Sequence, residues 1–115
     1  MTSHKKYLPK SGRFQVDETK VLDYLLSDKH PEGKSKAKFF STHGFQRRDW
    51  QVLQDALVHH GQNRPVISTA KSAYGVKYVL ECEIHTPNRS HPCIRSVWVS
   101  ESDDTFRLVT AYPAA

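Results

Sequence analysis

The sequence predicts one α+β domain, in which about three N-terminal helices pack on a C-terminal four-stranded antiparallel meander sheet. Apolar residues recur at helical spacing as far as residue 60, whereas after Pro65 they alternate with polar residues, as in strands with one buried face. The 115 residues are enough for a single core, and no internal repeat or long linker divides them. Helices followed by a run of strands are typical of an α+β domain.

The N-terminal end is predicted to be a flexible basic arm over residues 1–13, and the α+β domain to span residues 14–115. The arm carries three lysines and no periodic apolar face. The segment Phe14–Val16 either adds a short strand or leads into the first helix. We expect this helix over Lys20–Ser27, since Asp17 is a good N-cap and apolar residues follow it at helical spacing.

Two further helices are expected before the strands begin. The second has Ser35 as its N-cap, continues to about residue 43 and stops at a glycine. The third covers residues 49–60, with Asp49 as its N-cap and Gly61 as the residue just past its end.

Alternating β-branched and aromatic residues then predict the four strands. They are Val66–Ala70, Val76–His85, Ile94–Ser100 and Phe106–Tyr112.

The last strand has an unusual distribution of side chains. Strict alternation places Phe106, Leu108, Thr110 and Tyr112 on one face, so two hydroxyl groups end an otherwise apolar face. Pro113 then ends the strand, because proline has no N–H to continue a ladder. The two hydroxyls are therefore candidates for a functional role.

The charge of the chain favours an anionic partner. Seventeen Lys and Arg residues against twelve Asp and Glu give a formal net charge of +5. Such a balance suits nucleic acid, although many soluble proteins of other function share it. Cys82 and Cys93 are expected to be buried free thiols, the alternative being a disulfide between neighbouring strands. No apolar run is long enough to span a bilayer. We expect no membrane association and a cytoplasmic site of action, reached either directly or by delivery into a target cell as part of a larger effector.

No metal and no cofactor are expected. The seven histidines show no ligand spacing, and His59 and His60 point in different directions on a helix. The tripeptide Gly33–Ser35 matches only the end of a P-loop, without the upstream glycine and strand. The chain also lacks a Gly-x-Ser-x-Gly elbow, which argues against hydrolases of the triad kind.

The segment His30–Lys38 concentrates positive charge where the second helix begins. Lys34, Lys36 and Lys38 accompany the free backbone N–H groups of a helix N-terminus, and this combination suits a phosphate. His30 is the right residue type to move a proton near neutral pH. The alternative interpretation is a loop with a solvated lysine face.

Polar residues on the strands form a second candidate set. Arg95 and Lys77 would hold a phosphate, while the hydroxyls of Thr110 and Tyr112 would orient its oxygens. This interpretation requires a cleft in which the strand residues meet His30 and the lysines of the second helix. The alternative is that these residues occupy a solvated face of the sheet.

Several short motifs resemble a small bacterial family, the DUF6883 type, from about residue 16 to residue 113. The motifs that carry the resemblance are Tyr24-Leu25-Leu26, His30-Pro31-x-Gly33-x-Ser35-Lys36-Ala37-x-Phe39-Phe40, Gly44-Phe45, Trp50-x-x-Leu53, Tyr74-Gly75-x-Lys77-Tyr78, Val97-Trp98 and Leu108-Val109-Thr110-Ala111-Tyr112-Pro113.

More loosely, helices followed by an antiparallel sheet that ends in Thr-Ala-Tyr-Pro resemble the BECR group of ribonuclease toxins (barnase, EndoU, colicin and RelE types). The resemblance implies metal-independent RNA cleavage, with RNA, including tRNA, as substrate and an acidic antitoxin or immunity protein as partner. It gives His30 the role of general acid/base and Lys36 or Lys38 that of neutralising the phosphate. Lys34, Lys77 and Arg95 would hold the RNA backbone, and Thr110 with Tyr112 would position the scissile phosphate.

The chain shows no glutamate–histidine pair at the spacing of the barnase type. The function predicted from the sequence is a metal-independent endoribonuclease toxin, in which the RNA 2′-OH is the nucleophile. The alternative is a non-catalytic module of a phage, mobile element or toxin–antitoxin locus that binds nucleic acid or protein.

Overall fold

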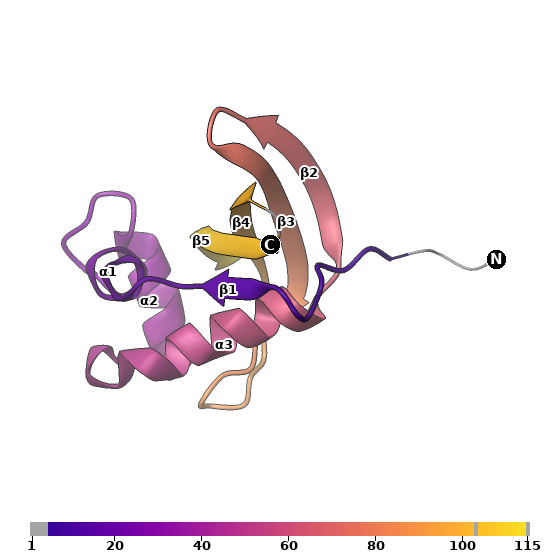
Figure 1. The fold of residues 1–115 in the computed structure, drawn as a ribbon. Helices are drawn as coiled ribbons and strands as arrows, with labels where there is room; N and C mark the ends of the chain where they lie inside the picture. The colour runs from indigo at the N-terminus through magenta and orange to yellow at the C-terminus, as the bar shows by residue number, and fades with distance from the viewer. Residues whose placement is uncertain (1–4, 103, 115) are drawn as a thin grey trace.

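The framework of the protein is a five-stranded sheet with helices against one face and one edge (Figure 1). The computed structural model describes residues 5–102 and 104–114. The strands are β1 Arg13–Gln15, β2 Val66–Ser72, β3 Gly75–Glu83, β4 Cys93–Ser102 and β5 Thr105–Pro113. The helices are α1 Glu18–Lys20, the π-helical turn η1 Val21–Leu25, α2 Lys34–Thr42, the 3₁₀ turn η2 Arg47–Asp49 and α3 Trp50–Asn63. The predicted α+β class is confirmed.

The predicted four-stranded antiparallel sheet is wrong in one respect, because β1 adds a fifth, parallel strand. The sheet order is β1-β5-β4-β3-β2, and Phe14 of β1 lies opposite Phe106 of β5. These two rings stack with centroids 5.1 Å apart, and Phe14 also meets Trp98 edge to face at 5.5 Å. Aromatic packing therefore holds a strand that is too short to show an alternating pattern. The other four strands form the predicted antiparallel meander.

A β-bulge in β5 changes which side chains face the core. Trp98 pairs with Leu108, but the next residue back along β4, Val97, pairs with Thr110, so Val109 has no partner. Beyond the bulge, Ala111 lies in the core and is fully buried. Thr110 and Tyr112 consequently lie on the opposite face from Phe106 and Leu108, and the predicted shared face of these four residues is wrong.

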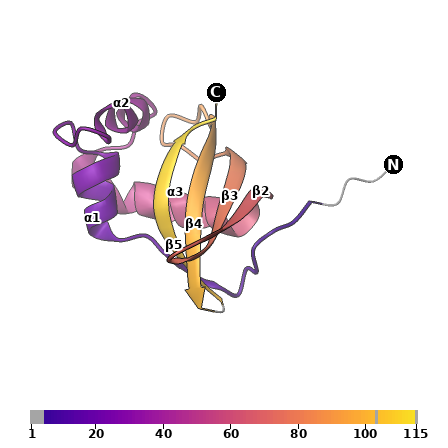
Figure 2. The ribbon, with the colours of Figure 1, turned by 90° about the horizontal axis from the view of Figure 1, so that it is seen from above.

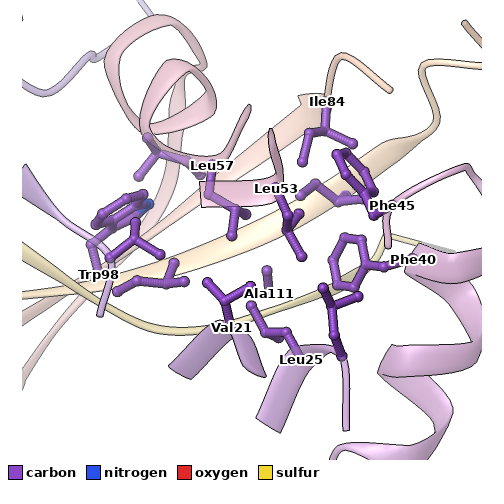
Figure 3. Packing of buried hydrophobic residues seen from close by; sticks show 14 of the residues in the cluster. Val21, Leu25, Phe40, Phe45, Leu53, Leu57, Ile84, Trp98 and Ala111 are labelled. Carbon is purple, nitrogen blue, oxygen red and sulfur yellow. The ribbon is translucent and has the colours of Figure 1, made fainter. Parts of the chain in front are cut away.

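The helices cover one face of the sheet and the outer edge of β5. Figure 2 shows α3 crossing behind the strands, with α1 and α2 beyond β5. In the core, Leu53 and Leu57 of α3 pack against the sheet and against the apolar residues of η1 and α2 (Figure 3). Each fully buried aliphatic side chain of this kind contributes roughly 1.5–3 kcal/mol. The core therefore fixes α3, η1 and α2 relative to β5, where the site described below is formed.

The first two helices begin close to their predicted positions. Asp17 is the N-cap of α1, as predicted, and the helix widens into the π-helical turn before it ends. Gly33, rather than Ser35, precedes α2. A β-carbon on Gly33 would overlap the carbonyl oxygen of Tyr24, so only glycine allows the start of α2 to approach η1 this closely.

Helix α3 begins after its predicted N-cap Asp49 but continues past Gly61 to Asn63. A β-carbon on Gly61 would lie 2.7 Å from the ring of Trp98. The predicted role of Gly61 as the residue past the helix end is therefore wrong. Glycine is required at position 61 because α3 lies very close to the indole ring of Trp98 on β4.

A buried chain of hydrogen bonds joins the same helix to the sheet. The indole N–H of Trp98 donates to Ser96 Oγ at 2.8 Å, and the Ser96 hydroxyl in turn lies 2.8 Å from His60 Nδ1. His60 Nε2 lies 3.0 Å from the carbonyl oxygen of Cys82, which can only accept. This fixes the tautomer of His60, with the proton on Nε2 and Nδ1 accepting from Ser96. Burial lowers the pKa of His60 to about 4, so the ring is neutral near pH 7.

The N-terminal segment has contacts with the domain, and the cysteines are less buried than predicted. Residues 1–4 of the predicted arm lie outside the described residues, whereas Leu8 is buried and the carbonyl of Lys6 accepts from the N–H of Val66 at 2.7 Å. Both thiols are free, but Cys82 is exposed and Cys93 is half-buried, so their predicted burial is wrong. The backbone of Cys82 departs from a regular strand, with a positive φ of 138°. In the described part of the chain, no helix is long and apolar enough to cross a membrane.

We predict that the free energy of unfolding falls as the pH is lowered from about 6.5 to about 4. The unfolded state takes up a proton at His60 near the ordinary histidine pKa of 6.5, whereas the folded state resists protonation until about pH 4. The stability contributed by the neutral ring is thus fully present above pH 6.5 and lost over this interval, by roughly 3 kcal/mol. Urea unfolding across the interval measures the loss. The variant His60→Gln should show a much flatter dependence, and an unchanged slope would contradict this account.

We also predict that Gly61→Ala destabilises the protein, although alanine favours helices by about 1 kcal/mol. Overpacking against the Trp98 ring costs about 1–3 kcal/mol, which should exceed that gain. In a Trp98→Phe background the obstructing half of the indole is absent, so the same substitution should become neutral or stabilising. Denaturant midpoints of the four proteins test this, and equal effects in both backgrounds would show that the close approach is irrelevant.

Candidate functional site

The candidate site is a cavity at the part of β5 that β1 does not cover. In the described chain, β1 pairs only with residues 105–107 of β5. Helices α1 and α2 contact β5, and Tyr24 of η1 reaches Thr110 beyond the end of β1. The cavity measures about 510 Å³. Its lining consists of Thr19, Lys20, Asp23, Tyr24, His30, Glu32, Val109 and Thr110. It therefore brings together residues from near both ends of the chain.

Tyr24 is the centre of this cavity. Its hydroxyl lies 3.0 Å from Thr110 Oγ1, and either group can be the donor. Its ring meets the ring of His30 edge to face, with centroids 5.0 Å apart. The ammonium groups of Lys20 and Lys36 lie 5.0 and 5.3 Å from the centroid of the tyrosine ring, within range for cation–π attraction. Tyr24 thus links the histidine, two cations and the hydroxyl of β5.

The loop before α2 fixes the orientation of His30. Its Nδ1 accepts from the backbone N–H groups of Glu32 at 3.0 Å and Gly33 at 3.2 Å. The lone pair of Nδ1 is therefore occupied, and in the neutral ring the proton resides on Nε2. This geometry supports hydrogen-bond donation from Nε2 and leaves Nδ1 unable to act as a base. The role of His30 as general acid/base stays a prediction that this contact does not favour.

Two carboxylates in the cavity were not anticipated from the sequence. Asp23 and Glu32 both line it and are exposed. Lys36 donates to the backbone carbonyl of Glu32 at 3.2 Å, which holds that turn against α2. A carboxylate two residues after a histidine in a His-Pro-Glu-Gly turn was the signal available in the sequence. The glutamate and the histidine thus share one cavity, although their spacing does not match the barnase type.

The structure brings together three of the predicted site residues, His30, Lys36 and Thr110. Lys34 and Lys38 lie on the other flank of α2, where they line a separate cavity of about 560 Å³. The reason is the helical period, since residues two positions apart point in different directions.

The remaining predicted residues lie on the strands. Arg95 Nε donates to Glu81 at 2.8 Å, and this bond and charge raise the pKa of the guanidinium. Tyr112 lies opposite Arg95 in the β4–β5 register. Lys77 is exposed on β3. Tyr112 shares a face of β5 with Thr110, so the exposed sheet face borders the cavity, but the charge of Arg95 is already paired with a carboxylate.

A metal site does not emerge from the part of the chain that the structure describes. No group of three or more His, Cys, Asp or Glu residues there is arranged to hold an ion. The side chains that line the cavity offer two carboxylates, a histidine that donates from Nε2, the ammonium group of Lys20 and three hydroxyls, and the ammonium group of Lys36 lies beside the ring of Tyr24.

The fold is similar to that of a solved structure. It superposes with a TM-score of 0.68 on a chain of the contact-dependent growth inhibition toxin–immunity protein complex from Klebsiella pneumoniae 342. The sequences are 19% identical, and the alignment covers 85% of this chain and 97% of that chain. At this identity the likeness establishes a shared fold.

Comparison of the sequence with protein families identifies the family of the chain. No curated protein matches it. A family model described as "Domain of unknown function (DUF6883)" matches residues 7–115, nearly the whole chain. This match confirms the resemblance seen in the sequence motifs, and the chain belongs to the DUF6883 family.

Proposed function

We propose that this domain is a toxin that cleaves RNA without a metal ion, in the cavity around Tyr24. The observation that carries the proposal is the gathering of carboxylate, histidine, lysine and hydroxyl groups in one cavity. The toxin–immunity complex of similar fold supports it, as does the net charge of +5, which suits a polyanionic substrate. From the similarity to the contact-dependent growth inhibition complex, we also propose that the domain acts in the cytoplasm of a target cell.

The inventory matches what RNA cleavage requires. RNA supplies its own nucleophile, the 2′-OH, so the protein must remove that proton, stabilise the phosphorane and protonate the leaving 5′ oxygen. In this proposal Glu32 is the base, because Nδ1 of His30 is occupied. His30 Nε2–H donates to a nonbridging phosphate oxygen, and the ammonium of Lys36 stabilises the negative charge. Thr110 holds the hydroxyl of Tyr24, which donates to the leaving oxygen.

The alternative function is a non-catalytic module that binds nucleic acid or protein. It is favoured by one observation, since the similar complex contains an immunity protein as well as a toxin. The positive charge of this chain argues for the toxin side, because a protein that covers a basic surface would itself be expected to be acidic.

The direct test is incubation of the purified protein with tRNA and with single-stranded RNA in the presence of a chelator. We expect fragments that end in 2′,3′-cyclic phosphate, as 2′-OH attack requires. Intact RNA at high protein concentration, together with harmless expression in bacteria, would refute the toxin proposal. Salt-dependent RNA binding without cleavage would favour the binding module instead.

We predict that Glu32→Gln lowers the cleavage rate by about 10²–10⁴-fold, because the amide cannot accept the 2′-OH proton. Glu83→Gln is the matched control, since this glutamate is exposed on β3, outside the lining of the cavity, and should leave the rate unchanged. Single-turnover cleavage of an RNA oligonucleotide measures both. If Glu32→Gln cleaves at the original rate and Asp23→Asn does not, the base is Asp23.

We predict that Tyr24→Phe and Thr110→Val each slow cleavage, with effects on kcat/KM that are not additive. Because Thr110 acts only through its hydrogen bond to the hydroxyl of Tyr24, the double variant should lose little more than Tyr24→Phe alone. Each should also cost about 1 kcal/mol of unfolding free energy. Tyr74→Phe, at a side chain that is 77% exposed, is the control for loss of a hydroxyl. Full additivity in the cycle would mean that the two hydroxyls act separately.

A further inference from the structure

The second cavity lies on the opposite flank of α2 from the candidate site. It measures about 560 Å³ and extends from the end of η1 across α2 to the segment before α3. We name it the α2 groove; its lining is Leu26, Asp28, Pro31, Lys34, Ser35, Ala37, Lys38, Ser41 and Arg47. It shares the loop before α2 with the candidate site, because His30 lines one cavity and the adjacent Pro31 lines the other.

The α2 groove carries cations that have no carboxylate partner. Among the described residues, the ion pairs within 4.0 Å join Arg48 to Asp49, Arg95 to Glu81 and Arg107 to Glu101. None of these pairs involves Lys34, Lys38 or Arg47, and Asp28 is the one acidic residue in the lining. The lining of the groove therefore carries a net positive charge, since Asp28 offsets only one of its three cations.

The position of Arg47 is fixed by the fold. Its guanidinium Nη1 donates to the carbonyl oxygens of Leu22 and Leu26, the latter at 3.2 Å, so it binds one residue of η1 and the residue just past it. These two hydrogen bonds hold the guanidinium of Arg47 in place in the lining of the groove. Lys34 and Lys38, one helical turn apart on α2, also line the groove and are exposed. The charged rim is thus built on fixed backbone elements.

The floor of the groove is apolar and indicates the class of ligand. Leu26, Pro31 and Ala37 contribute to it, and the lining contains no aromatic side chain. Single-stranded RNA is normally held by bases stacked on aromatic rings, which this groove cannot offer. Apolar contact framed by lysine and arginine instead suits a protein segment in which an aliphatic residue is flanked by carboxylates.

We infer that the α2 groove is the docking site of an acidic protein partner, which inserts an aliphatic side chain between carboxylates that pair with Lys34 and Lys38. The solved complex of similar fold contains a protein partner, which agrees with this kind of occupant. A partner bound in the groove would contact the loop that positions His30 and Glu32, without entering the candidate site. This last step, control of activity, rests on the proposed function, whereas docking itself does not.

The test uses the full chain and a synthetic peptide in which leucine is flanked on both sides by glutamates. Backbone amide NMR should show shifts concentrated at residues 26–41 and 47. The pair Lys34→Glu with Lys38→Glu should weaken peptide binding about 10-fold or more. The pair Lys71→Glu with Lys77→Glu makes the same change in net charge at exposed positions of β2 and β3, away from the groove, and should change the affinity by about 2-fold or less. A peptide with glutamine for glutamate should bind weakly, as should one with serine for leucine.

Several results would overturn the inference. They are absence of peptide binding, equal weakening by the two charge-reversing pairs, and shifts in the groove caused by a uridine oligonucleotide instead of the peptide. The last would make the groove part of an RNA path. Glu32→Gln should bind the peptide as the unmodified chain does. If the chain without substitutions binds the peptide in the groove but cleaves no RNA, the proposed function is refuted and the docking site is still supported.

Discussion

The attachment of α3 to the sheet is the constraint on which the rest of the structure depends. Trp98, Ser96 and His60 form a fully buried hydrogen-bonded chain that ends on a backbone carbonyl of β3, and Gly61 lets the helix touch the indole. The N-terminal half of α3 lies farther along the helix from this anchor and contacts β1 and η1. There, Gln54 donates to the carbonyl of Val16 at 2.7 Å and so sets where α1 begins. A helix anchored at one end thus positions the segment that carries Tyr24.

The candidate site exists because β5 is only partly paired on its outer side. A full-length neighbouring strand would occupy the space where Tyr24 and His30 now lie. The bulge at Val109 completes the arrangement, since it turns the hydroxyl of Thr110 away from the core face and toward the edge. Short edge strands and bulges are common ways in which proteins limit the exposed edge of a sheet. In this protein the same two features accompany a polar cavity.

Much of the fold could be predicted from the sequence because alternation and helical spacing are strong signals. Each of the four longer strands lies within two residues of its predicted bounds. The failures have local causes. The three residues of β1 are too few to show a period, and the aromatic stack that holds Phe14 involves a residue far away in the sequence. The extra residue at Val109 leaves no trace in composition but exchanges the faces of everything after it.

The site was predictable to a lesser extent. His30, Lys36 and Thr110 do meet, which their residue types suggested. The separation of Lys36 from Lys34 and Lys38 follows from the helical period and was available in the sequence. The His-Pro-Glu-Gly turn marks Glu32 as a neighbour of His30, but the contacts of Tyr24 and Glu32 in the cavity depend on how the loop before α2 folds back over η1, which no pattern shows. The direction in which His30 presents its nitrogens likewise depends on two backbone N–H groups that no pattern reveals.

The bond between Tyr24 and Thr110 has a consequence for the order of events in folding. The two residues are 86 positions apart, and β1 likewise pairs with the C-terminal strand. Contacts of such long sequence separation carry a high loop-closure cost and form late. A chain that is still emerging from the ribosome, or from any pore through which it passes N-terminus first, therefore lacks an assembled cavity until its last strand is free. The topology itself delays the appearance of the site until the domain is whole.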